Sequence, residues 1–320
     1  TIRQNEPLAD YVFYLPLDGP VSSKKFLTIT APEMVFFVKY DIWYYYIKYC
    51  KQFKIPVYFI SSVFRQSQLY FKWYGYFFNA ILRRVTHFFV QNQSSLELLY
   101  NNSIPQVTVT GDTRFDRVFE NSLKAPSFPE IEQLRGTGKM FIAGSTWPAD
   151  EQYLAKLYAA HKSDFRFVIV PHEVSEQSIK NTVSLFSGAV RYSQWDQKSD
   201  VPVLIIDRIG MLSALYKYAD IAYIGGGFGK GIHNILEAVV FGPPVLFGPV
   251  YKKFREANDL IRWKSAFTFK SYKELNELVT DLSHNEDRLT KIKEINLNYI
   301  AGNRGATDLI INYLKLNHSL

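Results

Sequence analysis

The chain has 320 residues, which is long enough for two domains, and its hydrophobic share of 47% is ordinary for a globular protein. It contains no run of eighteen or more apolar residues, which excludes a membrane-spanning helix within this sequence, and its single cysteine excludes an intrachain disulfide framework. The net charge of +7 at pH 7 leaves an anionic partner open.

The first half of the chain alternates short β-rich runs with helical ones. The pattern predicts strands at residues 35–38, 56–61, 87–90 and 107–110, and helices at residues 40–52, 66–84 and 94–100. Strand–helix–strand repetition of this kind is typical of a parallel, doubly wound sheet. The chain begins with Thr1 instead of Met, and no strand–turn–helix unit opens it. We therefore expect an N-terminal segment to be missing from this sequence.

A proline-rich break at residues 125–129 precedes a second alternating half. Strands are predicted at residues 140–143, 167–170, 203–206, 221–224 and 244–247, followed by a helical tail from Tyr272. The sequence therefore predicts an α/β fold of two Rossmann-like domains, residues 1–124 and 125–320, with parallel sheets facing across a cleft. Ligands of such sheets bind at the carboxyl ends of the strands.

Basic and aromatic residues gather in the first half. Residues 36–89 hold eight Lys or Arg residues, one acidic residue and twenty-one aromatic residues. Cations interleaved with aromatic rings suit an anionic membrane surface, although a basic face over an aromatic core has the same composition. No recognition motif supports nucleic acid as a partner. The candidate membrane-facing or acceptor-facing residues are Lys39, Trp43, Arg65, Lys72, Arg83 and Arg84.

The strongest chemical signal is the glycine-rich run GGGFGKG at residues 225–231, which follows the predicted strand 221–224 and opens a helix. Its five glycines let the backbone approach a ligand closely and expose N–H groups to an anion. The spacing matches neither the dinucleotide-binding nor the P-loop signature. His233, Asn234 and Glu237 follow the run. Glu237 either accepts hydrogen bonds from ribose hydroxyls or forms a capping box with Asn234.

Three other strand ends carry small or polar residues. Gly144, Ser145 and Thr146 follow the strand 140–143, His172 follows 167–170, and Gly210 follows 203–206. Small hydrogen-bond donors at a strand-to-helix turn are natural phosphate contacts, and a histidine there can bind phosphate or a base. Each residue also has a plainer interpretation as a helix cap, a core histidine or a simple turn.

Several chemistries lack their signature. No two aspartates stand two residues apart, so the D-x-D metal motif is absent, and the six histidines and one cysteine show no zinc spacing. No G-x-S-x-G nucleophile elbow occurs either. We expect neither a metal nor a cofactor.

The order and spacing of the phrases resemble the Kdo (3-deoxy-D-manno-octulosonic acid) transferases of lipopolysaccharide synthesis, over nearly the whole chain. The phrases are KYDIW at 39–43, VTGDTRFD at 109–116, GST at 144–146, PH at 171–172, GG at 225–226, HNILE at 233–237 and PVLFGP at 244–249. The resemblance implies a metal-independent, inverting GT-B glycosyltransferase that moves Kdo from CMP-Kdo to a lipid A precursor, lipid IVA. It also implies a place at the cytoplasmic face of the bacterial inner membrane, peripheral or anchored by a segment outside this sequence.

The resemblance implies roles for individual residues as well. Asp41 falls where the family more often has a catalytic-site Glu, and Lys39 replaces a second Glu; as a plainer alternative, Asp41 caps the following helix. The family's proposed general base is a Glu in a Gly-Glu turn, and nothing before Asp41 matches it. We therefore expect the base to lie in the missing segment, and this chain to bind donor yet transfer little. The candidate donor-binding residues are Gly144, Ser145, Thr146, His172, Gly210, Gly225, Gly226, Gly227, His233, Asn234 and Glu237.

Two other functions stay open. A GT-B glycosyltransferase that uses a UDP- or GDP-sugar would need the same residues, because Glu237 on ribose and glycines on a diphosphate serve any nucleotide. A non-catalytic protein with this fold could instead bind a membrane surface, and it would bind vesicles without any affinity for nucleotides.

Overall fold

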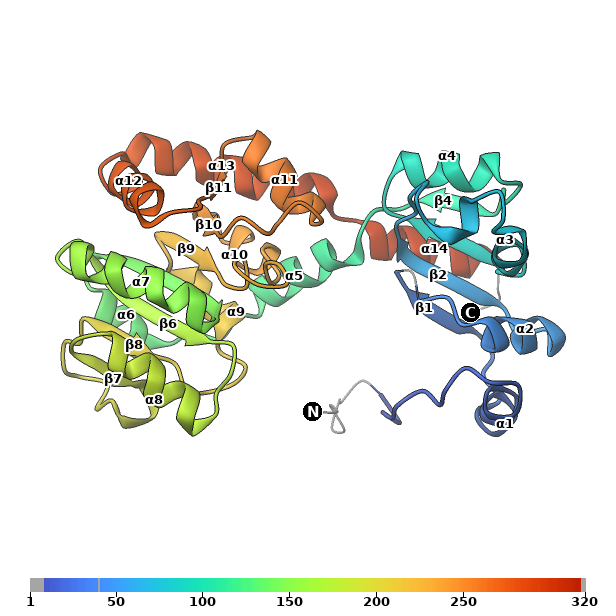
Figure 1. Cartoon of the computed structure of the whole chain (residues 1–320), viewed down its shortest axis with the longest axis horizontal. Coiled ribbons are helices and arrows are strands. Elements are labelled where there is room, and N and C mark those ends of the chain that lie inside the picture. Colours follow the sequence, from blue (N-terminus) through green and yellow to red (C-terminus); the bar gives the residue numbers. More distant parts are fainter. Residues whose placement is uncertain (1–8, 40, 318–320) are drawn as a thin grey trace. The chain divides into compact units, whose positions relative to one another are not determined.

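The computed structural model describes residues 9–39 and 41–317. Contacts divide the chain into two units (Figure 1). Unit 1 comprises Thr1–Asp116 together with Asn303–Leu320, and unit 2 comprises Arg117–Gly302. Helix α5 (Thr113–Leu123) begins in unit 1 and ends in unit 2, just before the boundary expected between residues 124 and 125.

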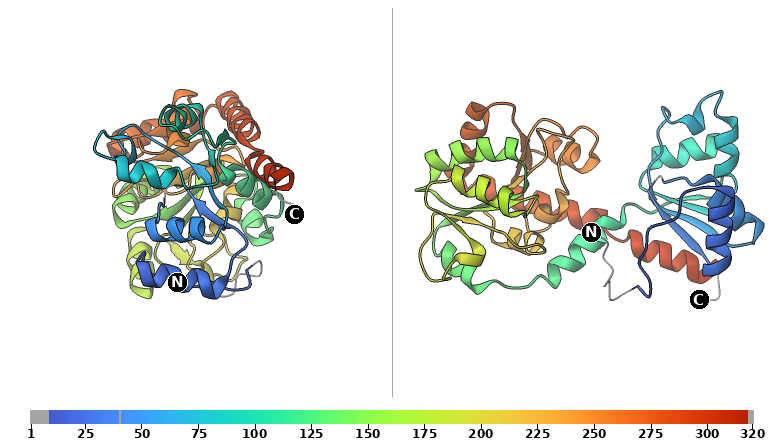
Figure 2. Two further views of the ribbon diagram at one scale, coloured as in Figure 1. Left: turned by 90° about the vertical axis from the view of Figure 1, so that its right-hand side faces the viewer. Right: turned by 60° about the horizontal axis from the view of Figure 1, so that its bottom comes forward.

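Unit 1 is built on a four-stranded parallel sheet in the order β1 (Val35–Val38), β2 (Val57–Ser62), β3 (His87–Val90) and β4 (Val107–Val109). Helices α1 (Pro20–Thr30), α2 (Tyr44–Gln52), α3 (Tyr76–Leu82) and α4 (Gln93–Asn101) contribute apolar side chains to a core with these strands. Helix α14 (Ala306–Asn317) packs on the sheet through a separate cluster, Tyr58, Phe89, Ile310 and Leu314 (Figure 2). The four predicted strands are confirmed to within one residue at each end.

The single long helix predicted at residues 66–84 is wrong. This segment folds as a 3-10 turn, η1 (Leu69–Phe71), followed by α3, with Gly75 between them. A Cβ atom on Gly75 would lie 1.9 Å from the carbonyl oxygen of Leu69. Glycine therefore lets the backbone fold back against η1, and the helix begins anew after it. Helix α1, which precedes the first predicted strand, was not predicted.

Unit 2 holds a seven-stranded parallel sheet. Its strand order is β11 (Ala266–Thr268), β10 (Val245–Phe247), β9 (Ile221–Ile224), β5 (Lys139–Thr146), β6 (Phe165–Pro171), β8 (Val203–Ile205) and β7 (Ala189–Arg191). The five predicted strands are confirmed, and the two that were missed are the three-residue edge strands β7 and β11. The strand order reverses between β5 and β9, which is the switch point where open α/β sheets bind ligands.

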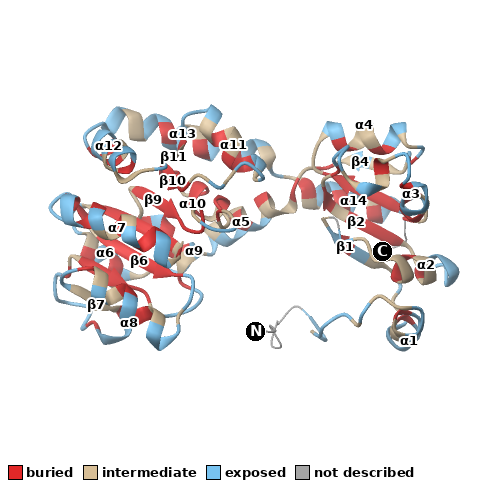
Figure 3. Cartoon of the chain, in the orientation of Figure 1, coloured by how far each residue is buried: buried red, intermediate tan, exposed pale blue. Residues whose placement is uncertain are grey.

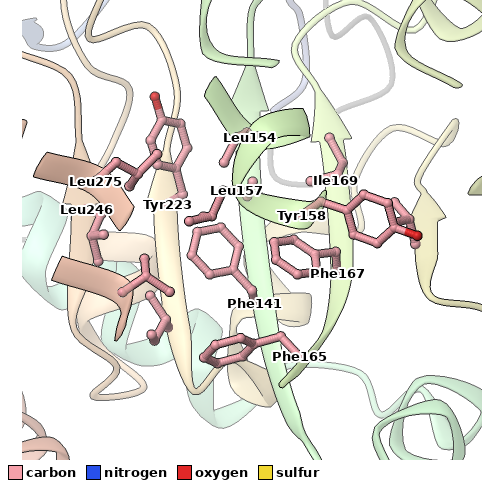
Figure 4. Close-up of a cluster of buried hydrophobic side chains, with 14 of the residues drawn as sticks. Phe141, Leu154, Leu157, Tyr158, Phe165, Phe167, Ile169, Tyr223, Leu246 and Leu275 are labelled. Carbon is pink, nitrogen blue, oxygen red and sulfur yellow. The ribbon is translucent and has the colours of Figure 1, made fainter. Parts of the chain in front are cut away.

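The sheet of unit 2 is largely buried along its inner strands, β10, β9, β5, β6 and β8, which Figure 3 shows mostly in red. Helices α7 (Pro148–His161), α8 (Glu176–Leu185), α12 (Tyr272–Ser283) and α13 (Glu286–Asn303) pack on it through a core cluster (Figure 4). Phe141 of β5 stacks on Phe167 of β6 with ring centroids 5.1 Å apart. The shorter helices α6 (Pro129–Arg135), α9 (Leu212–Leu215), α10 (Leu236–Val239) and α11 (Arg255–Arg262) complete the unit. The core fixes the strands and therefore the position of their carboxyl ends.

Candidate functional site

Three strand ends of unit 2 are joined at the switch point of the sheet. The backbone N–H of Gly225, after β9, donates to the carbonyl of Gly144 in β5 at 2.9 Å. The N–H of His172, after β6, donates to the carbonyl of Thr146 at 2.9 Å. The structure thus brings together the turn at residues 144–146, His172 and the glycine run, which sequence reasoning had placed at separate strand ends.

The glycine run packs directly against neighbouring backbone. A Cβ atom on Gly225 would lie 2.1 Å from the carbonyl oxygen of Ser145, and one on Gly227 would lie 2.5 Å from the backbone nitrogen of Gly248. No other residue type fits these two positions without a backbone shift. The close approach sets the path of the loop that leads to His233, whose N–H donates to the carbonyl of Gly225 at 3.2 Å.

A buried aspartate, which the sequence analysis did not identify, holds the two turns together. Asp150 is 1% exposed, and its Oδ2 accepts hydrogen bonds from the backbone N–H groups of Trp147 and Gly226, both at 2.9 Å. Its Oδ1 accepts from the Tyr223 hydroxyl at 2.7 Å. A carboxylate with three donors is well satisfied in the interior, so it fixes the glycine run on the turn after β5. The signal in the sequence was an acid in the first turn of a helix that begins with proline.

Three aromatic rings meet at the same edge of the sheet: Trp147, His172 and His233, called the ring cluster below. Trp147 Nε1 donates to His233 Nε2 at 3.0 Å, with the two rings 12° from parallel. The ring of His172 stacks on each of the others with centroids 4.5 Å apart. Burial and then the neighbouring His172 lower the pKa of His233, while Asp150 acts in the opposite direction. Trp147 was not identified from the sequence, although it directly follows Thr146.

Asn234 and Glu237 are paired with each other. Asn234 Nδ2 donates to Glu237 Oε1 at 3.0 Å, whereas the N-cap of α10 is Ile235 and has no side-chain cap. The capping-box interpretation is therefore wrong. Asn234 Oδ1 is buried without a hydrogen-bond partner among the described residues, so it is an unsatisfied acceptor beside the glycine run. Burial and then the charge of Glu237 raise the pKa of Tyr216 well above its usual value.

Two candidate residues of unit 2 occupy other surroundings. The hydroxyl of Thr146 is buried and donates to Glu151 Oε1 at 2.9 Å, so it supports the turn from inside. Burial is the main cause that raises the pKa of Glu151. Gly210 is exposed in the turn after β8, and no atom lies within 4 Å of a Cβ atom placed on it.

In unit 1, Asp41 is exposed on the loop before α2. The interpretation of Asp41 as the cap of this helix is wrong, because Asp18 has that role. Asp18 Oδ1 accepts from the backbone N–H groups of Tyr45 at 2.9 Å and Tyr46 at 3.3 Å. The Asp41 carboxylate is therefore not engaged by the first turn of α2.

Unit 1 also exposes an aromatic surface edged by cations, called the aromatic–cationic surface below. Its exposed rings precede or lie on α3, and Trp73 is the most exposed of them at 92%. Arg84 lies 6.0 Å from the ring centroid of Tyr44, which lies 5.2 Å from that of Phe77. The surface comprises Trp73, Tyr74, Tyr76, Phe77 and Phe78 with Lys72, Arg83 and Arg84.

The other candidate residues of unit 1 differ from one another. Trp43 packs against the core of unit 1 and is not part of the aromatic–cationic surface. Arg65 is exposed on the loop before η1, and Lys39 is half-buried after β1 with a positive φ of 64°. Across residues 9–39 and 41–317, no group of three or more His, Cys, Asp or Glu side chains could hold a metal ion. Within the same residues, every helix is too short or too polar to cross a bilayer.

Two α/β units, each built on a parallel sheet and one with a glycine-rich turn at its switch point, are typical of the fold of GT-B glycosyltransferases and epimerases. UDP-GlcNAc 2-epimerase from Neisseria meningitidis, bound to UDP-GlcNAc, is similar with a TM-score of 0.63 and 22% identity. The similarity covers 93% of this chain and 80% of that one. It shows the fold, and the predicted GT-B class is confirmed.

The sequence comparisons identify the relatives more narrowly. Residues 1–117 match the family model of 3-deoxy-D-manno-octulosonic-acid transferase (kdotransferase). The transferase of this name from Rickettsia prowazekii is 27% identical over 310 residues, covering 91% of this chain and 65% of the relative. That from Chlamydia trachomatis serovar A is 26% identical over 302 residues, covering 89% and 68%. The chain is thus a relative of the Kdo transferases, as its motifs indicated, and it spans about two thirds of the length of these relatives.

Proposed function

We propose that this chain acts in an inverting, metal-independent transfer of Kdo from CMP-Kdo to a lipid A precursor, lipid IVA, in lipopolysaccharide biosynthesis. The observation that carries the proposal is the meeting of the glycine run, the turn at residues 144–146 and the ring cluster at one switch point. The relationship to proteins named Kdo transferases supports the identity of the transferred sugar.

The site of unit 2 suits an anionic nucleotide. Four N–H groups of the glycine run donate to acceptors inside unit 2, those of Gly225, Gly226, Gly229 and Gly231. A phosphate would therefore bind the other N–H groups of the run, and the rings of His172 and His233 supply further N–H groups. Glu237 supplies carboxylate oxygens that accept hydrogen bonds from ribose hydroxyls. The sugar donor CMP-Kdo carries one phosphate and one sugar carboxylate. A protein site that binds these two anionic groups therefore needs N–H and O–H groups above all.

The reaction forms a bond between an acceptor hydroxyl oxygen and the anomeric carbon of Kdo, while the bond from that carbon to the phosphate oxygen breaks and CMP leaves. The hydroxyl proton passes to a general base. Asp41, exposed in unit 1, is the candidate acid–base residue of this chain.

The aromatic–cationic surface is our candidate for the membrane contact. Tyr and Trp side chains favour the headgroup region of a bilayer, and Lys and Arg favour anionic lipids. Exposed rings beside Lys72, Arg83 and Arg84 combine both preferences. Through this surface, unit 1 would contact the cytoplasmic face of the inner membrane, where the lipid acceptor is embedded.

A calorimetric titration with CMP, and with UDP and GDP as controls, tests the proposal. We expect CMP to bind best and Glu237→Ala to weaken binding roughly tenfold to a hundredfold, as for a hydrogen bond to a charged group. The exposed Glu277 on α12 provides a matched control, Glu277→Ala, which should bind CMP like the unchanged chain. Preference for UDP or GDP would favour another GT-B glycosyltransferase. Vesicle binding by a folded sample without nucleotide affinity would favour a membrane-surface binding protein.

A further inference from the structure

We propose that Trp147 is a positioning residue that holds His233 as the neutral Nδ1–H tautomer, so that this histidine meets an anionic ligand through one N–H group. The inference deepens the proposed function and rests on it for the identity of the ligand. It concerns a residue that neither the sequence motifs nor the site expectations included.

The hydrogen bond between the two rings determines where the proton lies. An indole N–H can only donate, so at 3.0 Å the Nε2 atom of His233 must be its acceptor. A neutral imidazole that accepts at Nε2 carries its hydrogen at Nδ1. The two rings lie 12° from parallel, which suits a bond in the plane of both rings. Protonation of Nε2 would set two donors against each other.

The two loops that carry the partners of this bond are held together by one carboxylate. Asp150 Oδ2 accepts from the N–H of Trp147 and from the N–H of Gly226, each at 2.9 Å. His233 is tied to the same loop through its N–H to Gly225. Gly226 also lies against the ring, because a Cβ atom on Gly226 would be 3.1 Å from His233 Cδ2. The distance between indole and imidazole is therefore set by the backbone, and not by free side-chain rotation.

Among the described residues, the titratable groups that act on the pKa of His233 are His172 and Asp150. Burial and His172 lower the pKa of His233, and Asp150 raises it. The hydrogen bond from Trp147 also lowers the pKa of His233, as burial does, because it can form only while Nε2 is unprotonated. Removing the indole N–H should therefore raise the pKa of His233 and release its tautomer. Replacing His172 with an uncharged ring should leave the tautomer unchanged.

The test is two-bond 1H–15N NMR on the full chain with 15N-labelled histidine, with His233 assigned by its loss in His233→Gln. We expect the Nδ1–H tautomer in the unchanged chain and in His172→Phe, which keeps a ring in the stack. In Trp147→Phe, which keeps a ring but lacks the N–H, we expect a mixture of tautomers and a higher pKa of His233. CMP affinity should fall roughly twofold to tenfold, the range for one neutral hydrogen bond.

An Nε2–H tautomer in the unchanged chain would overturn the proposal, even if Trp147→Phe failed to fold. The proposal would also be overturned if Trp147→Phe changed neither the tautomer nor the pKa of His233. The proposed function fails separately: CMP would then not bind, while the tautomer in the unchanged chain could still be Nδ1–H. CMP binding with the wrong tautomer would leave the function standing and remove the role of Trp147.

Discussion

The substitution Gly225→Ala tests whether the glycine run depends on close backbone approach. The new Cβ atom would lie 2.1 Å from the carbonyl oxygen of Ser145, 2.6 Å from its carbonyl carbon and 2.7 Å from the Cα of Thr146. All three atoms belong to the backbone of β5, so no side chain can move aside. Overpacking a well-packed core costs about 1–3 kcal/mol, and a clash with backbone belongs at the upper end. We expect the free energy of unfolding of unit 2 to fall by about 3 kcal/mol.

Gly229→Ala is the matched control within the same run. The nearest atom to its Cβ would be the Gly226 carbonyl oxygen at 3.7 Å, which is an ordinary contact, and Gly229 does not have a positive φ. We expect this variant to be unchanged or stabilised by up to about 1 kcal/mol. Urea unfolding followed by circular dichroism, with a CMP titration of each folded variant, would measure both effects. Equal stability and equal CMP affinity for the two variants would refute the close-approach argument.

Three further outcomes follow from unit 1. Burial lowers the pKa of His87 to about 4, below the unfolded value of about 6.5. The free energy of unfolding should therefore be highest above pH 6.5 and fall by up to about 3 kcal/mol towards pH 4. Urea unfolding across this pH range should show this dependence in the unchanged chain and not in His87→Phe. Asp116 accepts hydrogen bonds from Gly305 N, Thr307 N and Thr307 Oγ1. Asp116→Ala should therefore lower the free energy of unfolding by about 1–2 kcal/mol and speed hydrogen exchange in α14. Unchanged exchange would contradict its capping role. Trp73→Ala should weaken binding to anionic vesicles and change the free energy of unfolding by no more than about 0.5 kcal/mol, because Trp73 is exposed. Trp43→Ala should destabilise unit 1, because Trp43 packs against its core. Vesicle sedimentation and thermal unfolding distinguish the two effects.

The sheets could be predicted from the sequence because buried parallel strands leave short apolar runs between helices. Of the eleven strands in the described residues, all except the edge strands β7 and β11 of unit 2 were predicted, and their bounds differ from the predicted ones by a few residues at most. The break at Gly75 could not be predicted, because it depends on the approach of Leu69, a contact that no local pattern contains. Helix α1 was missed because its sequence, PVSSKKFLTIT, places only Ser23 and Leu27 in the interior.

The site was predictable where it follows a rule about strand ends, and not where it depends on contacts between turns. The turn at residues 144–146, His172 and the glycine run were expected at the carboxyl edge because parallel strands end there together. Trp147 and Asp150 became visible only with the structure, since their roles come from His233 and Gly226, both more than seventy residues away along the chain. Asp116 caps α14 within unit 1 by accepting from Gly305 and Thr307, and this role also depends on residues far along the chain.

Two adjacent carboxylates in the first turn of α7 explain how the loops of the site are held in place without a ligand. Asp150 binds the glycine run and the turn after β5, and Glu151 accepts hydrogen bonds from Thr146 at 2.9 Å and Thr182 at 3.0 Å. Buried carboxylates are costly unless they are hydrogen-bonded, and the start of a helix favours their negative charge. Because these internal acids hold the backbone in place, the ligand is not needed to organise the loops. A nucleotide sugar that binds at these preorganised loops loses little binding free energy to ordering them.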